Sequence, residues 1–381
     1  MKICGIICEY NPLHRGHRHQ FQKIREAFGA ESGIVCLMSG NFVQRGAPAI
    51  VDKSLRAAAA IACGADLVLE LPVTYALSSA EGFAAGGVKI LSPFCHRLCF
   101  GAECADEEAL YSTAQALLSP EFKAHLRTFL DEGISFPAAR QKALEAMGQP
   151  ADILTAPNNI LAVEYCKAIL TQKSNMQPYP ILRQGSYHAQ EADRENPSAT
   201  SVRTLMEADG SWEEFVPAEA VPYLKDATLH SLSRGERAVL NTLRTLPDEA
   251  FSALPGGSEG LWRKFMRACR EKATPEEIID ATKSKRYTRT RIDRMLLCAF
   301  LGITEEMCRA TVPYVRVLGL NNRGREILKL ARKSGAFVNA GEAQDDPYQL
   351  LENRCGDLYG LFAEIPEPPG AEARRRLQYL P

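Results

Sequence analysis

Residues 3–17 read ICGIICEYNPLHRGH. The apolar run over residues 3–8 predicts a β-strand, and residues 16–28 have the pattern of a helix. The polar turn between them, which contains His14, Gly16 and His17, therefore joins the end of a strand to the start of a helix. In a doubly wound sheet, this turn is where the phosphates of a nucleotide bind.

The alternation of strand-like and helical segments continues to about residue 205. Strands that alternate with helices indicate βαβ units and a parallel sheet. We therefore predict an α/β fold with a doubly wound, parallel-sheet, Rossmann-like domain over residues 1–205. Further strands are expected at residues 34–38, 66–72, 97–100 and 180–183, with helices at residues 51–63 and 78–91 and another that starts at Ser201.

The second half of the chain has a different pattern, because helical segments dominate it. We predict a mostly helical domain over residues 206–381. Its helices are expected at residues 234–245, 260–273, 291–301 and 324–333, with one strand at residues 314–320.

The composition is that of an ordinary soluble enzyme. The chain has 381 residues, of which 46% are hydrophobic and 24% charged, and its net charge is -1. This excludes a protein that binds polyanions over its whole surface, and the length suggests two domains. Met1 and Lys2 lead directly into the first strand, and no apolar stretch approaches the roughly 20 residues of a membrane span. We therefore expect a cytoplasmic protein that does not associate with a membrane.

The twelve cysteines are scattered, many of them within apolar runs. One cluster, formed by Cys95, Cys99 and Cys104 around His96, has residue types that bind zinc. The same segment has the pattern of a strand, and no second pair of ligands follows at zinc-finger spacing. We therefore predict no metal site.

The histidine turn has the residue types that adenylyl transfer requires. A helix N-terminus offers unpaired N–H groups and a positive dipole end, and Gly16 lets the backbone approach phosphates closely. His14 and His17, three residues apart, can both donate to phosphate oxygens, where negative charge accumulates during the reaction. The alternative is a pair of solvated histidines on a polar loop. The strand before the turn and the helix after it favour the phosphate site.

A second polar segment, residues 198–203, opens a later helix. Thr200, Ser201 and Arg203 are candidate phosphate contacts, because hydroxyl and guanidinium groups both donate to anions. A plain helix cap by the hydroxyl groups explains this segment equally well.

The histidine turn, together with a later Ser/Thr-rich segment that ends in arginine, resembles the nucleotidyltransferase superfamily. More narrowly, the chain resembles the bacterial tRNA(Met) cytidine acetate ligase family from its first residues to about Leu330. The segments that carry this resemblance are residues 9–17, 38–46, 66–72, 100–103, 157–161 and 285–289.

The resemblance implies a ligase reaction in two steps. ATP and acetate form acetyl-adenylate with release of pyrophosphate, and the acetyl group then passes to N4 of the wobble cytidine of elongator tRNA(Met). ATP would be a substrate, His14 and His17 would be catalytic, and no obligate protein partner is implied. The resemblance leaves a requirement for magnesium open. The implied ATP site consists of Ile7, Cys8, Glu9, Tyr10, Asn11, Pro12, Leu13, His14, Arg15, Gly16, His17, Arg18, His19, Gln20, Gly101, either Asn158 or Asn159, and Arg183.

A basic segment in the second half suggests where tRNA binds. Residues 283–294 contain six cations and a single acid, Asp293. The spacing of Ile292, Leu296 and Ala299 predicts a buried helix face, which would leave much of the basic set outward. Arginines can grip phosphates, and a tyrosine can stack on an unpaired base. The alternative is a solvated charged face. The candidate tRNA-binding residues are Lys283, Lys285, Arg286, Tyr287 and Arg289.

Two other functions share the histidine turn. One is a small-molecule adenylyltransferase that makes a nucleotide cofactor, and the basic segment argues against it. The other is a non-catalytic regulator that binds a nucleotide, and the two histidines argue against it, because ATP can be held without them.

Overall fold

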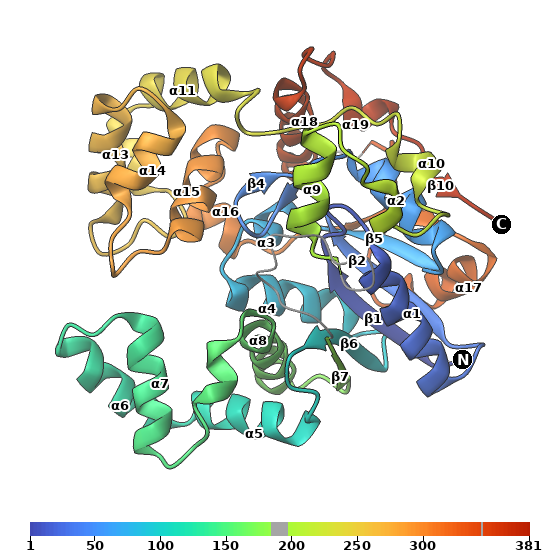
Figure 1. Ribbon diagram of the computed structural model, residues 1–381, viewed down its shortest axis with the longest axis horizontal. Helices are drawn as coiled ribbons and strands as arrows, with labels where there is room; N and C mark the ends of the chain where they lie inside the picture. The colour runs from blue at the N-terminus through green and yellow to red at the C-terminus, as the bar shows by residue number, and fades with distance from the viewer. Residues whose placement is uncertain (184–196, 344–345) are drawn as a thin grey trace.

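The computed structural model describes residues 1–183, 197–343 and 346–381. At its centre is a mixed sheet with the strand order β10-β8-β5-β2-β1-β6-β7, and β9 pairs with β8 (Figure 1). Five strands of the first half are mutually parallel, as the alternating pattern predicted. These strands are β1 (Ile3–Cys8), β2 (Gly33–Ser39), β5 (Leu67–Leu71), β6 (Arg97–Ala102) and β7 (Gln177–Leu182).

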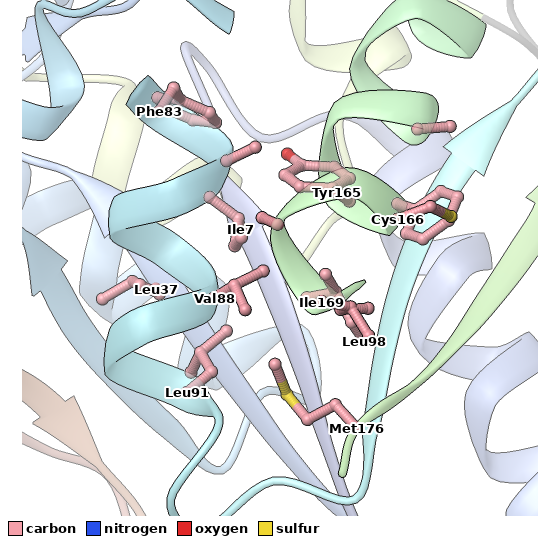
Figure 2. Packing of buried hydrophobic residues seen from close by; sticks show 14 of the residues in the cluster. Ile7, Leu37, Phe83, Val88, Leu91, Leu98, Tyr165, Cys166, Ile169 and Met176 are labelled. Carbon is pink, nitrogen blue, oxygen red and sulfur yellow. The ribbon is translucent and has the colours of Figure 1, made fainter. Parts of the chain in front are cut away.

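Helices cover both faces of this sheet, because successive strand residues point to opposite sides. One face packs on α4 (Ala80–Leu91), α5 (Glu107–Leu118) and α8 (Pro157–Thr171). Figure 2 shows Val88 and Leu91 of α4 and Ile169 of α8 gathered near Ile7 of β1. The other face packs on α1 (Arg15–Phe28), α2 (Lys53–Ala62), α9 (Ala199–Glu207) and α10 (Val221–Leu224).

Shorter elements complete this half. A two-stranded antiparallel hairpin, β3–β4, follows β2 and was not expected from the sequence pattern. Helices α6 and α7 lie at the lower left of Figure 1, beside α5. The bounds of the elements not yet given are β3 (Phe42–Val43), β4 (Ala47–Pro48), α3 (Val73–Ala76), α6 (Pro120–Asp131) and α7 (Phe136–Ala146).

A helical unit with its own core follows in the second half. The helices labelled α11, α13, α14 and α15 at the upper left of Figure 1 belong to it. Its core also includes Phe42 of the β3–β4 hairpin, so the unit packs directly on the first half. The helices are α11 (Glu236–Thr245), α13 (Leu261–Glu271), α14 (Pro275–Thr282) and α15 (Arg289–Leu301), with the short α12 (Asp248–Ser252) and α16 (Glu305–Arg309).

The C-terminal segment returns to the central sheet. Strand β8 (Val315–Leu320) is present where a strand was expected, and it pairs antiparallel with β5. The division of the chain at residue 205 stays a prediction, and residues after 315 share the sheet of the first half. The remaining elements are β9 (Phe337–Asn339), β10 (Gln378–Tyr379), α17 (Asn322–Ala331), α18 (Pro347–Tyr359) and α19 (Ala371–Arg374).

Buried ion pairs join this C-terminal segment to the start of α2. The Nζ of Lys53 lies 2.6 Å from Glu70 of β5 and 2.9 Å from Glu372 of α19. Arg375 binds both carboxylate oxygens of Asp52, the N-cap residue of α2. Because a buried charge is costly without its partner, these pairs hold the C-terminal segment against α2. Among the helices that the structure describes, none is long and apolar enough to cross a membrane.

Candidate functional site

A pocket of about 530 Å³ opens where β1, β6 and β7 end. Its wall also includes the starts of α1, α8 and α9 and part of the β3–β4 hairpin. Ligands of open α/β sheets bind at the carboxyl ends of the strands, and this volume suits a small molecule such as a nucleotide. The pocket therefore lies at the turn that the sequence singled out.

The loop between β1 and α1 is held from several sides. Tyr10 has a φ of 45°, is buried, and has its hydroxyl group 3.3 Å from the Sγ of Cys36. The side chain of Asn11 accepts a hydrogen bond from the N–H of Ile50 at 2.7 Å, and the Asn11–Pro12 peptide bond is cis. The side-chain contacts of Tyr10 and Asn11 therefore tie the loop to β2 and to the segment before α2.

His14 and His17 cap the first helix with their side chains. His14 is the N-cap residue of α1, and its Nδ1 accepts a hydrogen bond from the N–H of Gly16 at 3.2 Å. The Nδ1 of His17 accepts one from the N–H of His14 at 3.1 Å. Since Nδ1 is an acceptor in both rings, each neutral imidazole carries its proton on Nε2. The two rings stack with their centroids 3.7 Å apart.

Both histidines are neutral at physiological pH. Burial lowers the pKa of His14 to about 3, and the positive charges of Arg183 and Arg203 act in the same direction. Burial also lowers the pKa of His17 well below its usual value, helped by His14 and Arg183. The pair therefore presents two Nε2–H donors to the pocket. Such donors suit an anionic ligand whose charge grows during a reaction. The alternative of solvated histidines does not fit, because His14 is only 4% exposed.

Two arginines add positive charge to the pocket wall. Arg203 donates to the carbonyl of Asn11 at 2.7 Å and to the hydroxyl of Thr200 at 3.1 Å, so it braces the β1–α1 loop. Arg183 follows β7, and its backbone N–H donates to the carbonyl of Ala102 at 2.9 Å. Burial lowers the pKa of both guanidinium groups, although both stay charged at neutral pH.

At the start of α9, some side chains cap the helix and others line the pocket. The cap residue is Ser198, whose hydroxyl accepts from the N–H of Ser201 at 3.0 Å. The Ser201 hydroxyl donates to the carbonyl of Ser198 at 2.9 Å, so this side chain is used within the cap. Thr200 and Arg203 line the pocket and Ser201 does not. The cap interpretation therefore holds for Ser198 and Ser201, and phosphate contacts by Thr200 and Arg203 stay a prediction.

The start of α8 distinguishes the two asparagines. Asn158 lines the pocket, and its side chain donates to Glu103 at 2.7 Å. Asn159 is buried, and its side-chain oxygen accepts from the N–H of Cys104 at 2.8 Å. The structure therefore places Asn158 on the pocket wall and Asn159 behind it.

The chain matches known proteins over nearly its whole length. A family model described as HIGH Nucleotidyl Transferase matches residues 1–367. The tRNA(Met) cytidine acetate ligase of Clostridium novyi is 39% identical over 357 residues, covering 88% of this chain and 89% of that protein. The protein of the same name from Clostridium tetani is 37% identical over 409 residues, covering 97% of each. The chain belongs to the tRNA(Met) cytidine acetate ligase family.

Solved structures of this family have the same fold. The apo form of TmcAL from Thermotoga maritima matches with a TM-score of 0.90 and 29% sequence identity, and each chain is covered completely. TmcAL bound with alpha-thio ATP matches with a TM-score of 0.88, 29% identity and complete coverage of both chains. The doubly wound nucleotidyltransferase fold predicted from the sequence is therefore confirmed.

The pocket brings together most of the ATP-site residues that the family resemblance implied. Those that line it are Ile7, Cys8, Glu9, Tyr10, Asn11, His14, Gly16, His17, His19, Gln20, Gly101, Asn158 and Arg183. Pro12, Leu13, Arg15, Arg18 and Asn159 do not line it. Leu13 is buried in the core, and Arg18 points away from the pocket to pair with Glu219 at 2.6 Å. The implied range of residues 7–20 includes side chains on and off the pocket wall, because successive residues of a turn and a helix point in different directions.

Several other residues that line the pocket were not identified from the sequence. Gln44 and Arg45 come from the β3–β4 hairpin, and His230 and Ser231 come from the segment before α11. Residues 38–46 carried part of the family resemblance, which was a usable signal for the hairpin. The segment around His230 gave no such signal, because it reaches the pocket only through tertiary packing.

The basic segment lies at the N-terminal end of α15, in the loop after α14. Ile292, Leu296 and Ala299 are buried, as their spacing predicted. Two of the six cations bind main-chain carbonyls of other segments: Arg291 donates to the carbonyl of Gly256 at 2.9 Å, and Arg294 donates to the carbonyl of Gln44 at 3.1 Å.

Acids from other elements partly neutralise the remaining cations. Arg289 forms a two-point ion pair with Glu276, and Arg286 lies 2.9 Å from Glu259. Asp280 lies 3.7 Å from Lys283. The count of a single acid in this segment was therefore too low for the folded surface, because linear spacing does not show partners from neighbouring helices. Lys285 is exposed and makes no ion pair with any residue in the described ranges.

The cysteine cluster is part of the packed sheet. Cys95 and Cys99 are buried, and the Nδ1 of His96 accepts a hydrogen bond from the N–H of Ile3 at 3.1 Å. Among residues 1–183, 197–343 and 346–381, no group of three or more His, Cys, Asp or Glu side chains is arranged to hold a metal ion.

Proposed function

We propose that this chain is an ATP-dependent tRNA(Met) cytidine acetate ligase. It joins acetate to the α-phosphate of ATP, releases pyrophosphate, and transfers the acetyl group to N4 of the wobble cytidine of elongator tRNA(Met). The observation that carries this proposal is the buried, neutral histidine pair at the N-terminus of α1, flanked by Arg183 and Arg203. This set of donors suits a triphosphate that loses pyrophosphate.

The chemistry agrees with the side chains of the pocket. A carboxylate is a poor acyl donor, and adenylation supplies it with a good leaving group. In-line attack at the α-phosphorus needs positioning and charge stabilisation, and no protein nucleophile. The one thiol in the wall, Cys8, is unsuited to nucleophilic attack, because burial raises its pKa well above the usual value.

One experiment separates this function from its two rivals. Pyrophosphate release is measured with ATP alone, with acetate, and with acetate and tRNA(Met), and the tRNA nucleosides are then analysed for N4-acetylcytidine. Acetate-dependent release with N4-acetylcytidine in the product supports the ligase. Release that needs another small molecule supports a cofactor-making adenylyltransferase, and binding of ATP without release supports a regulator.

We expect Arg183→Ala to weaken ATP binding by roughly 10–100-fold, the usual effect of losing a hydrogen bond to a charged group. Arg183 lines the pocket opposite the β3–β4 hairpin, and burial strengthens its pairing with a phosphate. Calorimetric titration with ATP is the measurement. Arg15→Ala is the matched control, because Arg15 lies in the histidine turn but is exposed and off the pocket wall. Equal affinities in both variants would place the phosphates elsewhere.

We propose that tRNA contacts the basic segment through Lys285 and Arg286. Reversing both charges, Lys285→Glu with Arg286→Glu, should weaken tRNA binding and N4-acetylcytidine formation while acetate-dependent ATP–pyrophosphate exchange persists. The salt dependence of tRNA binding should fall by a slope of about 0.7–0.9 for each lost phosphate contact. Arg289 is left intact, because a glutamate there would face Glu276.

The control for this variant is a second charge reversal at exposed cations far from the segment. Arg332→Glu with Lys333→Glu suits this purpose, because both residues are exposed and follow α17 at the other end of the chain's fold (Figure 1). Equal losses in the two double variants would indicate a general effect of net charge, and the segment would then be a solvated surface.

A further inference from the structure

The pocket has two ends, which the order of the strands separates. Strands β6 and β7 lie on one side of β1, and they bring Gly101 and Arg183 to the pocket. Strand β2 lies on the other side of β1, and the hairpin that follows it brings Gln44 and Arg45. The histidine pair lies between the two ends, at the start of α1. If a nucleotide occupies the end near Gly101 and Arg183, the end near the hairpin has room for a second substrate.

The hairpin end is the one that the helical unit reaches. Arg294 of α15 donates to the carbonyl of Gln44 at 3.1 Å. Gly46 has a φ of 81°, and a Cβ there would lie 2.4 Å from the backbone N of Arg294, so the turn fits only without a side chain. Arg289, at the start of the same helix, lies five residues earlier, about 7–8 Å along the axis. An RNA on the basic segment therefore approaches the hairpin end of the pocket.

Glu9 is fixed at this end by both its backbone and its side chain. It directly follows β1, and its carbonyl accepts from Nη1 of Arg56 at 2.5 Å. Its Oε1 accepts from the N–H of Gln44 at 2.8 Å. The Oε2 of this half-buried carboxylate forms no hydrogen bond to the residues that the structure describes. One carboxylate oxygen is thus held in place and the other is available to a ligand.

Other groups in the described wall are poor acceptors for a proton. His14 and His17 already accept hydrogen bonds at Nδ1 and carry protons on Nε2. The Nδ1 of His230 lies 3.1 Å from the carbonyl of Thr228, and its Nε2 is buried 3.6 Å from Glu367, so neither ring nitrogen is open to a ligand. The wall contains one further carboxylate, Glu207, which is exposed at the end of α9.

We propose that Glu9 is a catalytic residue that receives the amino group of the target cytosine and accepts its proton. This assignment rests on the proposed ligase function and deepens it. A carboxylate is the side chain that pairs with the N4–H₂ of cytosine, so the same group recognises the base and acts on it. This role differs from the ATP contact implied for Glu9 by the family resemblance, since a carboxylate repels phosphate.

The proposed step is an acyl transfer from acetyl-adenylate to the N4 amino group of cytosine. The N4 nitrogen attacks the carbonyl carbon of acetyl-adenylate and forms the amide C–N bond. The bond from that carbon to the phosphate oxygen breaks, and AMP leaves with the electron pair. One N4 proton passes to Oε2 of Glu9 and then to solvent. Cytosine N4 is a weak nucleophile because its lone pair is delocalised into the ring, so a base at this position speeds the reaction.

The test compares two acceptors of the same acetyl-adenylate in each enzyme sample. Hydroxylamine is a strong nucleophile that needs no protein base, and acetohydroxamate formation therefore measures folded enzyme that makes the adenylate. Single-turnover acetylation of saturating tRNA(Met) measures the step assigned to Glu9. We expect Glu9→Gln to form hydroxamate within about twofold of the wild-type rate and to acetylate tRNA on the order of 100–10,000-fold more slowly. Glu9→Asp should fall between the two, because it keeps a carboxylate.

Glu26→Gln is the matched control, with both reactions expected at wild-type rates, because Glu26 is exposed on α1 and does not line the pocket. Since hydroxamate formation normalises each sample, partial unfolding of Glu9→Gln lowers both signals together and leaves their ratio interpretable. A wild-type ratio in Glu9→Gln overturns the assignment and leaves the ligase function standing. Failure of the wild-type enzyme to form acetate-dependent hydroxamate would instead overturn the proposed function.

Discussion

His14→Ala and His17→Ala should each slow acetate-dependent pyrophosphate release by on the order of 100–1000-fold, the usual cost of losing one donor to developing charge. Both rings are held by backbone N–H groups at Nδ1, which aims Nε2–H at the pocket without any rearrangement. Negative charge grows on the phosphate oxygens during adenylyl transfer, so donors that face these oxygens stabilise the transition state more than the resting triphosphate. ATP affinity should therefore change far less than turnover.

His14 also caps α1, so its alanine variant combines two effects. Loss of an N-cap costs about 0.5–2 kcal/mol of stability. His14→Asn separates them, because asparagine is a good N-cap whose shorter side chain lacks the Nε2–H donor. We expect His14→Asn to melt near the wild-type temperature and to release pyrophosphate as slowly as His14→Ala. Turnover near the wild-type level in either alanine variant would remove that histidine from the mechanism.

Arg56→Met should destabilise the protein more than any other single replacement proposed. Arg56 is fully buried in α2, and its guanidinium donates to the main-chain carbonyls of Val51, Glu9, Ser39 and Gly40. Each buried carbonyl left without a donor costs about 1–3 kcal/mol, so we expect a loss of about 4 kcal/mol or more. Three of these carbonyls, those of Glu9, Ser39 and Gly40, lie at the ends of β1 and β2, so the shape of the nucleotide pocket depends on the same side chain.

Denaturant unfolding with a fluorescence or circular dichroism signal gives the free energy of unfolding for this comparison. Arg18→Met is the matched control. Arg18 lies on α1 and pairs with Glu219 at 2.6 Å, but both side chains are about 40% exposed, so its loss should cost at most about 1 kcal/mol. Similar losses in the two variants would mean that the carbonyls around Arg56 find other partners.

Much of the secondary structure could be predicted because it depends on local spacing. The strands at residues 3–8 and 34–38 and the helix at 16–28 lie within one or two residues of their expected bounds. Other elements were not expected from the sequence. They include the short β3–β4 hairpin and the helices α5, α6, α7, α8 and α18. The expected strand at 314–320 was found, although its spacing gave no information about its antiparallel partner β5.

The candidate site also contains features that local sequence predicts and features that depend on tertiary contacts. The histidine turn was recognisable because one strand end and one helix start place its residues side by side. The contact of Arg203 with Asn11 could not be predicted, since it joins residues that are 192 positions apart. Asn158 and Asn159 are adjacent in the chain, and only the packing of α8 against Glu103 and Cys104 decides which one faces the pocket.

The sequence by itself determined the fold class, the family and the position of the nucleotide turn. Periodicity and short motifs act over a few residues, and these features require nothing more. Only the tertiary structure decided the neutral state of the histidines, the partial neutralisation of the basic segment by Glu259 and Glu276, and the place of Glu9 beside Gln44. Burial and the distance between charges set these properties, and both depend on which distant segments the fold brings together.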